Sequence, residues 1–259
     1  MMILEPWWVQ CISLLSDGSV HEIRLLDTDR PFYYNYEIKS NLGWKNICSI
    51  SSSRSHLMGL TKEGTINLRA NSYIFEAAKE WKDIISSKAG YEICVGLTNR
   101  GVLLYEINGE RRSHTGKFQN VRMIAAGNRK AYGLCNDGLL FCSDGIKDTV
   151  MAEDWSDIIV LAATNSNVYG LSKDGWVRSL YSADEEEVLI WKNMIDISAG
   201  GSHLIGLTRE NTLLSAGDNS RHQCEVSGWR NITHIFTGCY HTLAMNQDGE
   251  VMAPCNYWG

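Results

Sequence analysis

The chain has 259 residues, of which 44% are hydrophobic, and it carries a formal net charge of −6 with a sequence pI of about 5.7. Nucleic-acid-binding surfaces are basic because they displace counterions from phosphates, so this acidic balance argues against a nucleic-acid partner. The sequence shows no charged-then-apolar leader and no run of about 18 apolar residues, so we expect neither export nor insertion into a membrane.

The eight cysteines do not form a C-x-x-C pair, and several fall in predicted strands, where a free cysteine behaves as a small buried hydrophobe. We therefore expect reduced thiols and a cytoplasmic protein that has no cofactor. The cysteines are Cys11, Cys48, Cys94, Cys135, Cys142, Cys224, Cys239 and Cys255.

The first predicted element is a β-hairpin whose turn is Asp17-Gly18. An apolar run, an Asp-Gly turn and a second apolar run are typical of a hairpin, and glycine tolerates the positive φ that such a turn requires. The first strand of this copy would begin at the N-terminus, with Met1 and Leu4 at its apolar positions. Trp7 and Trp8 would then lie in the loop that follows that strand.

Residues 21–43 form the longest connector in the chain and contain a tyrosine-rich segment. One interpretation is an irregular outer strand whose rings pack on the body of the protein. The alternative is an interaction arm, because tyrosine is enriched at protein interfaces. We treat this arm as the second candidate binding site, with Phe32, Tyr33, Tyr34 and Tyr36 as its residues.

From residue 44 onward an aromatic anchor recurs at Trp44, Trp81, Phe118, Trp155, Trp191 and Trp229. Fifteen residues after each anchor the residue is small: Gly59, Gly96, Gly133, Gly170, Gly206 and Ala244. Twenty residues after each anchor stands Gly64, Gly101, Gly138, Gly175, Asn211 or Gly249. Self-similarity at a period of about 37 residues is the signature of a repeat architecture.

Within each copy, an apolar residue three positions after the anchor begins a further strand ahead of the hairpin. The residue eight positions after the anchor is always small, which indicates a crowded axis where the copies converge. These positions are Ser52, Ala89, Ala126, Ala163, Ala199 and Thr237. Small antiparallel sheets repeated radially make a β-propeller. The connector Tyr73–Lys79 has helical propensity but is too short for a stable helix, so we expect an outer strand or an irregular segment there.

The predicted fold class is all-β, a seven-bladed β-propeller that forms one domain over residues 1–259. The predicted repeat units are 1–43, 44–80, 81–117, 118–154, 155–190, 191–228 and 229–259. Only ten residues follow Gly249, so we expect the ring to be closed by pairing of terminal segments. The anchors should be buried between blades.

Three fragments resemble the repeats of the regulator-of-chromosome-condensation family: Ala199–Thr208, Ser215–Cys224 and Trp229–Ala244. The resemblance covers nearly the whole chain and is strongest over residues 191–251. It implies a seven-bladed propeller, and the short period is similar to that of bacterial members. It does not imply one function, because members include a nucleotide-exchange factor on chromatin, ubiquitin-ligase accessory domains and a secreted bacterial inhibitor of β-lactamases.

No residue pattern identifies catalysis, because neither G-x-S-x-G nor a glycine-rich phosphate loop is present. His56, His203 and His241 occupy one repeat position, three residues before the small residue. A zinc site would need three or four ligands at bonding distance, and these copies are not all neighbours, so we expect structural hydrogen bonding and no metal. Whether the three histidines are purely structural stays open.

The loop between the first and second strands varies between copies, whereas the anchor and the turn do not. Loops on a rigid scaffold usually carry recognition. The predicted function is a non-enzymatic scaffold that binds an unknown protein partner as a monomer. The alternatives are an enzyme or a carbohydrate or small-ligand binder that uses the axial face, and, more remotely, an exchange factor or inhibitor. The candidate loop residues are Arg54, Tyr91, Arg129, Asn165, Ser202 and Tyr240.

Overall fold

The computed structural model describes residues 3–7, 10–28, 30–70, 75–107, 110–113, 120–143, 148–181, 188 and 190–254. In this part of the chain the structure is built from antiparallel strands and one short 3-10 helix, η2 (Ala77–Glu80). The predicted all-β fold class is therefore confirmed. Of the positions discussed above, Met1, Trp8, Phe118 and Cys255 lie outside the described residues.

The strands follow the repeats. The first three units contain β1 (Ile3–Trp7), β2 (Gln10–Leu14), β3 (Val20–Asp27) and β4 (Tyr33–Asn41); β5 (Ile47–Ser52), β6 (His56–Thr61) and β7 (Ile66–Ala70); and β8 (Ile84–Gly90), β9 (Ile93–Thr98), β10 (Leu103–Ile107) and β11 (Glu110–Ser113). The next two contain β12 (Val121–Ala126), β13 (Ala131–Cys135), β14 (Leu140–Ser143) and β15 (Asp148–Ala152); and β16 (Ile158–Ala163), β17 (Val168–Ser172) and β18 (Val177–Ser179). The last two contain β19 (Met194–Ala199), β20 (His203–Thr208) and β21 (Leu213–Gly217); and β22 (Ile232–Thr237), β23 (Thr242–Asn246) and β24 (Val251–Met252).

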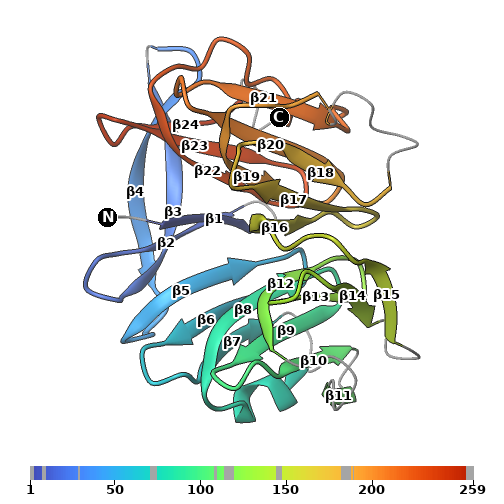
Figure 1. The fold of residues 1–259 in the computed structure, drawn as a ribbon. Coiled ribbons are helices and arrows are strands. Elements are labelled where there is room, and N and C mark those ends of the chain that lie inside the picture. The colour runs from blue at the N-terminus through green and yellow to red at the C-terminus, as the bar shows by residue number, and fades with distance from the viewer. Residues whose placement is uncertain are drawn as a thin grey trace.

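The first strands of the units form a closed circle, in which β1, β5, β8, β12, β16, β19 and β22 each contact the next and β22 contacts β1. Figure 1 shows the small sheets following one another around the molecule from β5 to β22, with β1 and β2 between the two ends of the series. The strands make six hydrogen-bonded sheets, because the first and last units share one seven-stranded sheet. Counting that sheet as two blades fits the expected seven.

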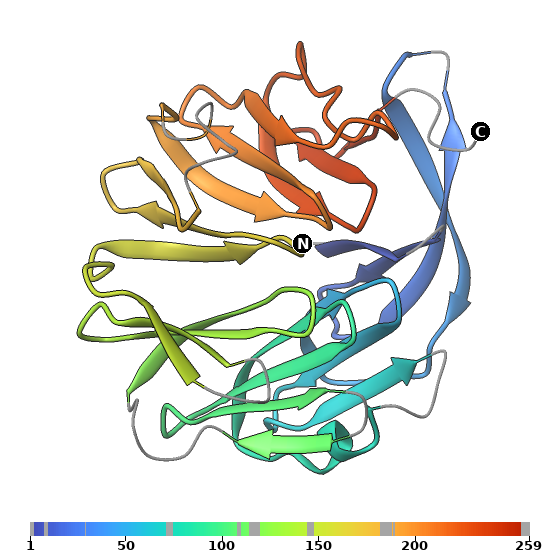
Figure 2. The same ribbon diagram turned by 90° about the vertical axis from the view of Figure 1, so that its right-hand side faces the viewer.

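Strand β4 closes the ring. It pairs with β3 along its length, and its first residues, Tyr33 and Tyr34, also pair with Met252 and Val251 of β24. Figure 2 shows the long β3–β4 ribbon running along the outside of the molecule. The expected pairing between the two ends of the ring is found here, with β4 of the first unit supplying the strand that the last unit lacks.

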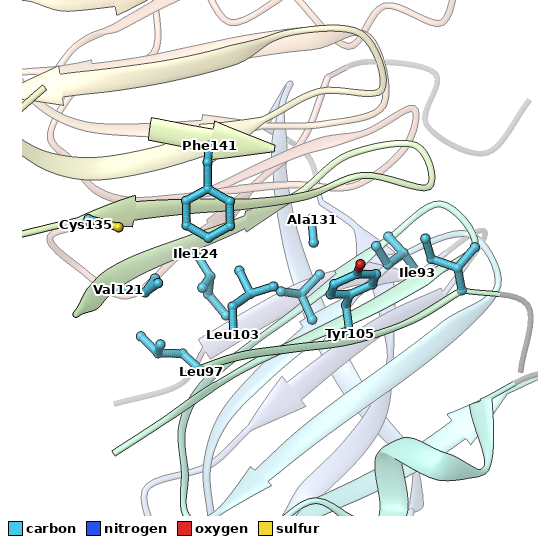
Figure 3. Close-up of a cluster of buried hydrophobic side chains, with 11 residues drawn as sticks. Ile93, Leu97, Leu103, Tyr105, Val121, Ile124, Ala131, Cys135 and Phe141 are labelled. Atoms are coloured by element: carbon cyan, nitrogen blue, oxygen red, sulfur yellow. The ribbon is translucent and has the colours of Figure 1, made fainter. Parts of the chain in front are cut away.

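The anchors behave as predicted where they are described. Trp81, Trp155, Trp191 and Trp229 are buried, whereas Trp44 is half-buried. The space between neighbouring units is filled by hydrophobic side chains from both units. Figure 3 shows one such cluster, in which residues of β9 and β10 pack against residues of β12, β13 and β14.

The predicted turns all have positive φ, from Gly18 at 82° to Asn211 at 59° and Gly249 at 77°. The turn also joins neighbouring units, because its carbonyl oxygen accepts a hydrogen bond from the first strand of the next unit. Examples are the amides of Ile84 and Met194, which donate to Gly64 and Gly175 at 3.0 Å in both cases.

Two local expectations are corrected. The described part of the connector 73–79 leads into η2, where the backbone amides of Ala77 and Ala78 donate to the buried carboxylate of Glu106 at 3.3 and 2.7 Å. This carboxylate supplies acceptors that a lone helical turn lacks. In addition, Trp7 belongs to strand β1 and not to the loop after it.

Candidate interaction surface

The loops between the first and second strands are linked across unit boundaries by backbone hydrogen bonds. The amide of Tyr91 donates to Gly127 at 3.2 Å, and that of Asn165 donates to Gly201 at 2.8 Å. The amide of Gly201 in turn donates to Cys239 at 3.2 Å. We call these linked loops the loop face. Their main chains are therefore tied to one another by hydrogen bonds that need no side chain.

The close approach of these loops requires glycine. A Cβ at Gly90 would overlap the carbonyl oxygen of Gly127, and a Cβ at Gly200 would overlap the carbonyl oxygen of Gly238. A Cβ at Gly127 would lie 2.9 Å from the carbonyl oxygen of Thr164. The absence of side chains therefore allows neighbouring loops to interlock.

The structure brings several predicted side chains of the loop face together in pairs. The guanidinium carbon of Arg54 lies 5.9 Å from the ring centroid of Tyr91, a geometry that favours cation–π attraction. Nη1 of Arg129 donates to Oε2 of Glu92 at 2.9 Å. Arg54 and Tyr91 are half-buried and so less exposed than expected.

The other predicted members of the loop face point to solvent. Tyr240 is 44% exposed, and Asn165 and Ser202 are also exposed. No described contact joins these three side chains into one cluster. They occupy equivalent loops of successive units, as the repeat spacing predicts, and offer separate contact points on the same surface.

The histidines at the shared repeat position are held by hydroxyl groups. Oγ1 of Thr242 donates to the carbonyl of Gln223 at 2.7 Å, so it must accept from Nε2 of His203 at 3.1 Å, which places the proton on Nε2. Nδ1 of His56 lies 3.1 Å from Oγ of Ser53. Burial lowers the pKa of His203 to about 4 and that of His56 to about 3, so both are neutral at pH 7.

The third histidine, His241, is half-buried. Its pKa is lowered to about 4, first by burial and then by the nearby His203. In the described ranges, no three His, Cys, Asp or Glu side chains meet as a metal-binding group. Hydrogen bonding to a neighbouring unit is the role that the structure supports for His203.

A channel of about 320 Å³ follows the axis. As predicted, the small residues line it: Ser52, Ala89, Ala126, Ala163, Ala199 and Thr237. Lys88 and Asp196 also line the channel, and both were missed in the sequence. Burial raises the pKa of Asp196, while the Ile197 amide, which donates to its carboxylate, and the charge of Lys88 act in the opposite direction.

The tyrosine-rich arm lies beside the last turn and not on the loop face. A hollow of about 560 Å³ is lined by Tyr33, Tyr34 and Tyr36 together with residues 248–251. The guanidinium of Arg30 lies 3.7 Å above the ring of Tyr33 and donates to Oε1 of Glu250 at 2.6 Å. The ring of Phe32 packs 6.3 Å from that of Trp229. The two candidate sites are therefore separate surfaces.

A further set of exposed side chains was missed. Each first strand from β5 onward has a β-bulge just after its first residue, and three bulged residues are exposed isoleucines. Ile85, Ile159 and Ile195 are 58%, 49% and 42% exposed. These isoleucines could have been found in the sequence, because each stands four residues after an anchor.

The closed circle of small antiparallel sheets defines the class of the molecule as a β-propeller. Solved structures of similar fold include human WBSCR16, with TM-score 0.69 and 15% identity over 95% of this chain and 87% of that one. The CRINKLY WD40 ectodomain of the Arabidopsis thaliana receptor kinase ACR4 gives TM-score 0.64 and 13% identity over 95% and 90% of the two chains. YCF48 bound to D1 peptide gives TM-score 0.54 and 11% identity over 98% and 96%.

One segment of the chain also matches a particular family of propeller repeats. The regulator of chromosome condensation (RCC1) repeat matches residues 194–223, which span β19 to the segment after β21. Residues 194–223 are therefore similar to an RCC1 repeat set within a propeller, which confirms the resemblance found in this part of the sequence. No curated protein matches the sequence. The helical part of the described chain includes nothing long and apolar enough to cross a membrane.

Proposed function

We propose that this propeller is a non-enzymatic scaffold that binds a protein partner through the loop face. The observation that carries the proposal is the backbone hydrogen bonding between loops, such as that from Asn165 to Gly201 at 2.8 Å. A surface that is already ordered loses little conformational entropy on binding. Tyrosine and arginine, which this surface presents, are enriched among residues that dominate binding energy.

The proposal also takes the chain to act as a monomer in a reducing, cytoplasmic environment. Cys48, Cys94, Cys135, Cys224 and Cys239 are free thiols, which supports the reducing environment. Burial raises the pKa of Cys94, Cys135, Cys224 and Cys239, so these thiols are protonated and weakly reactive at neutral pH.

The test needs a purified partner, identified first by capture on the immobilised propeller. Its affinity is then measured for a loop-face variant, Tyr91→Ala with Tyr240→Ala, and for a matched arm variant, Tyr33→Ala with Tyr34→Ala. Each tyrosine that dominates binding should cost about 2 kcal/mol or more. We expect the loss in the loop-face variant. Loss of affinity in the arm variant alone, with both variants folded, would contradict the proposal.

A small-ligand function of the axial channel is the second candidate. This candidate is supported by two charged residues, Lys88 and Asp196, that line the channel. The channel volume of about 320 Å³ is within the usual range for small-molecule sites. Native mass spectrometry of the purified protein tests it. A co-purifying small molecule that is absent from an Asp196→Asn variant would favour this candidate, and identical spectra of the two proteins would count against it.

A further inference from the structure

Strand β4 presents an unpaired edge. One edge pairs with β3 along the strand, but the other pairs with β24 only at Tyr33 and Tyr34. Beyond them, residues 35–41 are all exposed, and no described residue pairs with their outer edge. The unpaired N–H and C=O groups of such an edge form a template for another strand.

Hydrogen bonds at the start of β4 show which of its residues point their main-chain N–H and C=O groups toward the unpaired edge. The amide of Ala253 donates to the carbonyl of Phe32 at 3.0 Å, and the next amide, that of Tyr33, points away from β24 and donates to Arg30 at 3.3 Å. Because direction alternates along an antiparallel strand, the main-chain groups of Tyr34, Tyr36 and Ile38 point toward the β24 side. Tyr34 faces Val251, whereas Tyr36 and Ile38 face no described strand. A bulge at Lys39 ends this regular edge.

The side chains around this edge suit an apolar strand. Tyr36 and Ile38 are 44% and 52% exposed and project from the same face of β4. The hollow of about 560 Å³ lies where β24 stops and is lined by Asn35, Tyr36 and the turn Asp248–Gly249. An added strand would cover Tyr36 and Ile38 with two alternate apolar side chains.

Charged side chains of both signs lie around the edge, including an exposed lysine, Lys39, just beyond Ile38. Arg30 is occupied by Glu250 and by the ring of Tyr33. Glu37, which lies between the two apolar residues on the other face, is 3.9 Å from Arg24, and both side chains are at least half-exposed. Such a surface pair contributes little, so the Glu37 carboxylate can accept a new cation. Asp248 adds a second exposed carboxylate beside the hollow.

We propose that the β4 edge at Tyr36–Ile38 binds an extended segment of a protein partner with the pattern apolar, Lys or Arg, apolar. The segment adds a strand beside β4, so its main chain meets the free groups of Tyr36 and Ile38 and its cation meets Glu37. This inference rests on the proposed protein-binding function but uses a surface distinct from the loop face.

The test uses blocked heptapeptides with the sequence Thr-Thr-Val-Lys-Val-Thr-Thr and a matched peptide with Glu in place of Lys. Hydrogen exchange of the free protein, followed by NMR, should show fast-exchanging amides at Tyr36 and Ile38 and slow ones at Asn35 and Glu37. The Lys peptide should slow exchange at Tyr36 and Ile38. It should bind about tenfold more tightly than the Glu peptide, and a Glu37→Lys variant should reverse this preference.

A Tyr36→Ser variant should weaken binding of the Lys peptide, whereas the loop-face variant Tyr91→Ala with Tyr240→Ala should bind it unchanged. The inference is overturned if the Lys peptide protects neither amide, or if Glu37→Lys leaves the preference as it was. Because the loop-face experiment measures the captured partner and this one measures defined peptides, failure of one does not imply failure of the other.

Discussion

The indole ring of Trp81 lies directly over Gly96, so that a Cβ added to Gly96 would come within 2.8 Å of Cε3 of the ring. The same relation joins Trp44 to Gly59, at 2.7 Å. The same contact is found between Trp155 and Gly170 and between Trp191 and Gly206. The two most regular positions of the repeat are therefore the two sides of one contact. In these four units a glycine is needed on the second strand because the anchor ring occupies the place of its side chain, whereas the last unit holds Ala244 at this position.

The first prediction concerns this contact. Gly96→Ala should destabilise the protein by about 1–3 kcal/mol, because Trp81 is fully buried and cannot move away from the new methyl group. The free energy of unfolding is measured by denaturant titration. The same substitution in a Trp81→Phe background should cost less, because the smaller ring leaves room. Equal costs in the two backgrounds would contradict the contact.

The second prediction concerns the turns. Gly175→Val should cost about 1–3 kcal/mol, because a β-branched residue is forced to a positive φ. The structure adds a second reason, since a Cβ at Gly175 would lie 3.1 Å from the carbonyl oxygen of Met194 in the next unit. Asn211→Gly is the matched control and should be neutral or slightly stabilising. A Gly175→Val protein that melts like the parent would disprove the role of the turn.

The third prediction concerns pH. Burial holds the pKa of His203 at about 4, below its usual value of 6.5, so the unfolded state binds more protons between these values. Stability should therefore fall as pH is lowered from 6.5 toward 4, by up to about 1.4 kcal/mol per pH unit for each such histidine. The raised pKa of Asp196 acts in the opposite sense just above pH 3.8.

The measurement for this third prediction is the free energy of unfolding across that pH range for the parent and for His203→Gln. The variant keeps a hydrogen-bond donor but cannot titrate, so its profile should be flatter. The contribution of His56 remains in both proteins and serves as an internal reference. Parallel profiles would show that His203 is not held neutral by the fold.

The fourth prediction concerns Arg122, whose guanidinium joins two units. Nη1 donates to the carbonyl of Ile158 at 2.8 Å, and Nη2 donates to that of Trp155 at 3.2 Å. Arg122→Met should cost about 1.5–3 kcal/mol, the range for hydrogen bonds made by a charged group. Arg122→Lys should restore only part of this loss, because lysine lacks the planar fork. Nη2 also donates to the carbonyl of Ser156 at 3.3 Å. Full recovery with lysine, measured by denaturant titration, would rule out the clamp formed by these hydrogen bonds.

A further local feature of the repeat is a left-handed residue close to the start of the first strand. The residue two positions after the anchor has a positive φ of 58–61° at Asn46, Asp83, Asn120, Asn193 and Asn231. Asparagine and aspartate tolerate this conformation better than other residues with a Cβ. Each carbonyl of this set accepts a hydrogen bond from the turn of its own unit, as between Lys62 and Asn46 at 2.8 Å. The position thus ties the start of the first strand to the hairpin.

The candidate sites were harder to predict than the fold. The sequence located the loops of Tyr91 and Tyr240, because loop position follows from the repeat spacing. It could not show that Arg54 packs against Tyr91 or that Lys88 and Asp196 share the axial channel. Those relations join side chains from different units, and their distances depend on the curvature of the ring.

The strands, the hairpin turns and the repeat could be predicted from the sequence, because they depend on residues close together in the chain. Gly175 requires the same left-handed turn wherever its unit is placed. The closure of the ring, through pairing of Tyr34 with Val251, could not be predicted in this way. That pairing joins distant parts of the chain, and it forms because the circle of units brings the last blade, which lacks an outer strand, beside the insertion after β3.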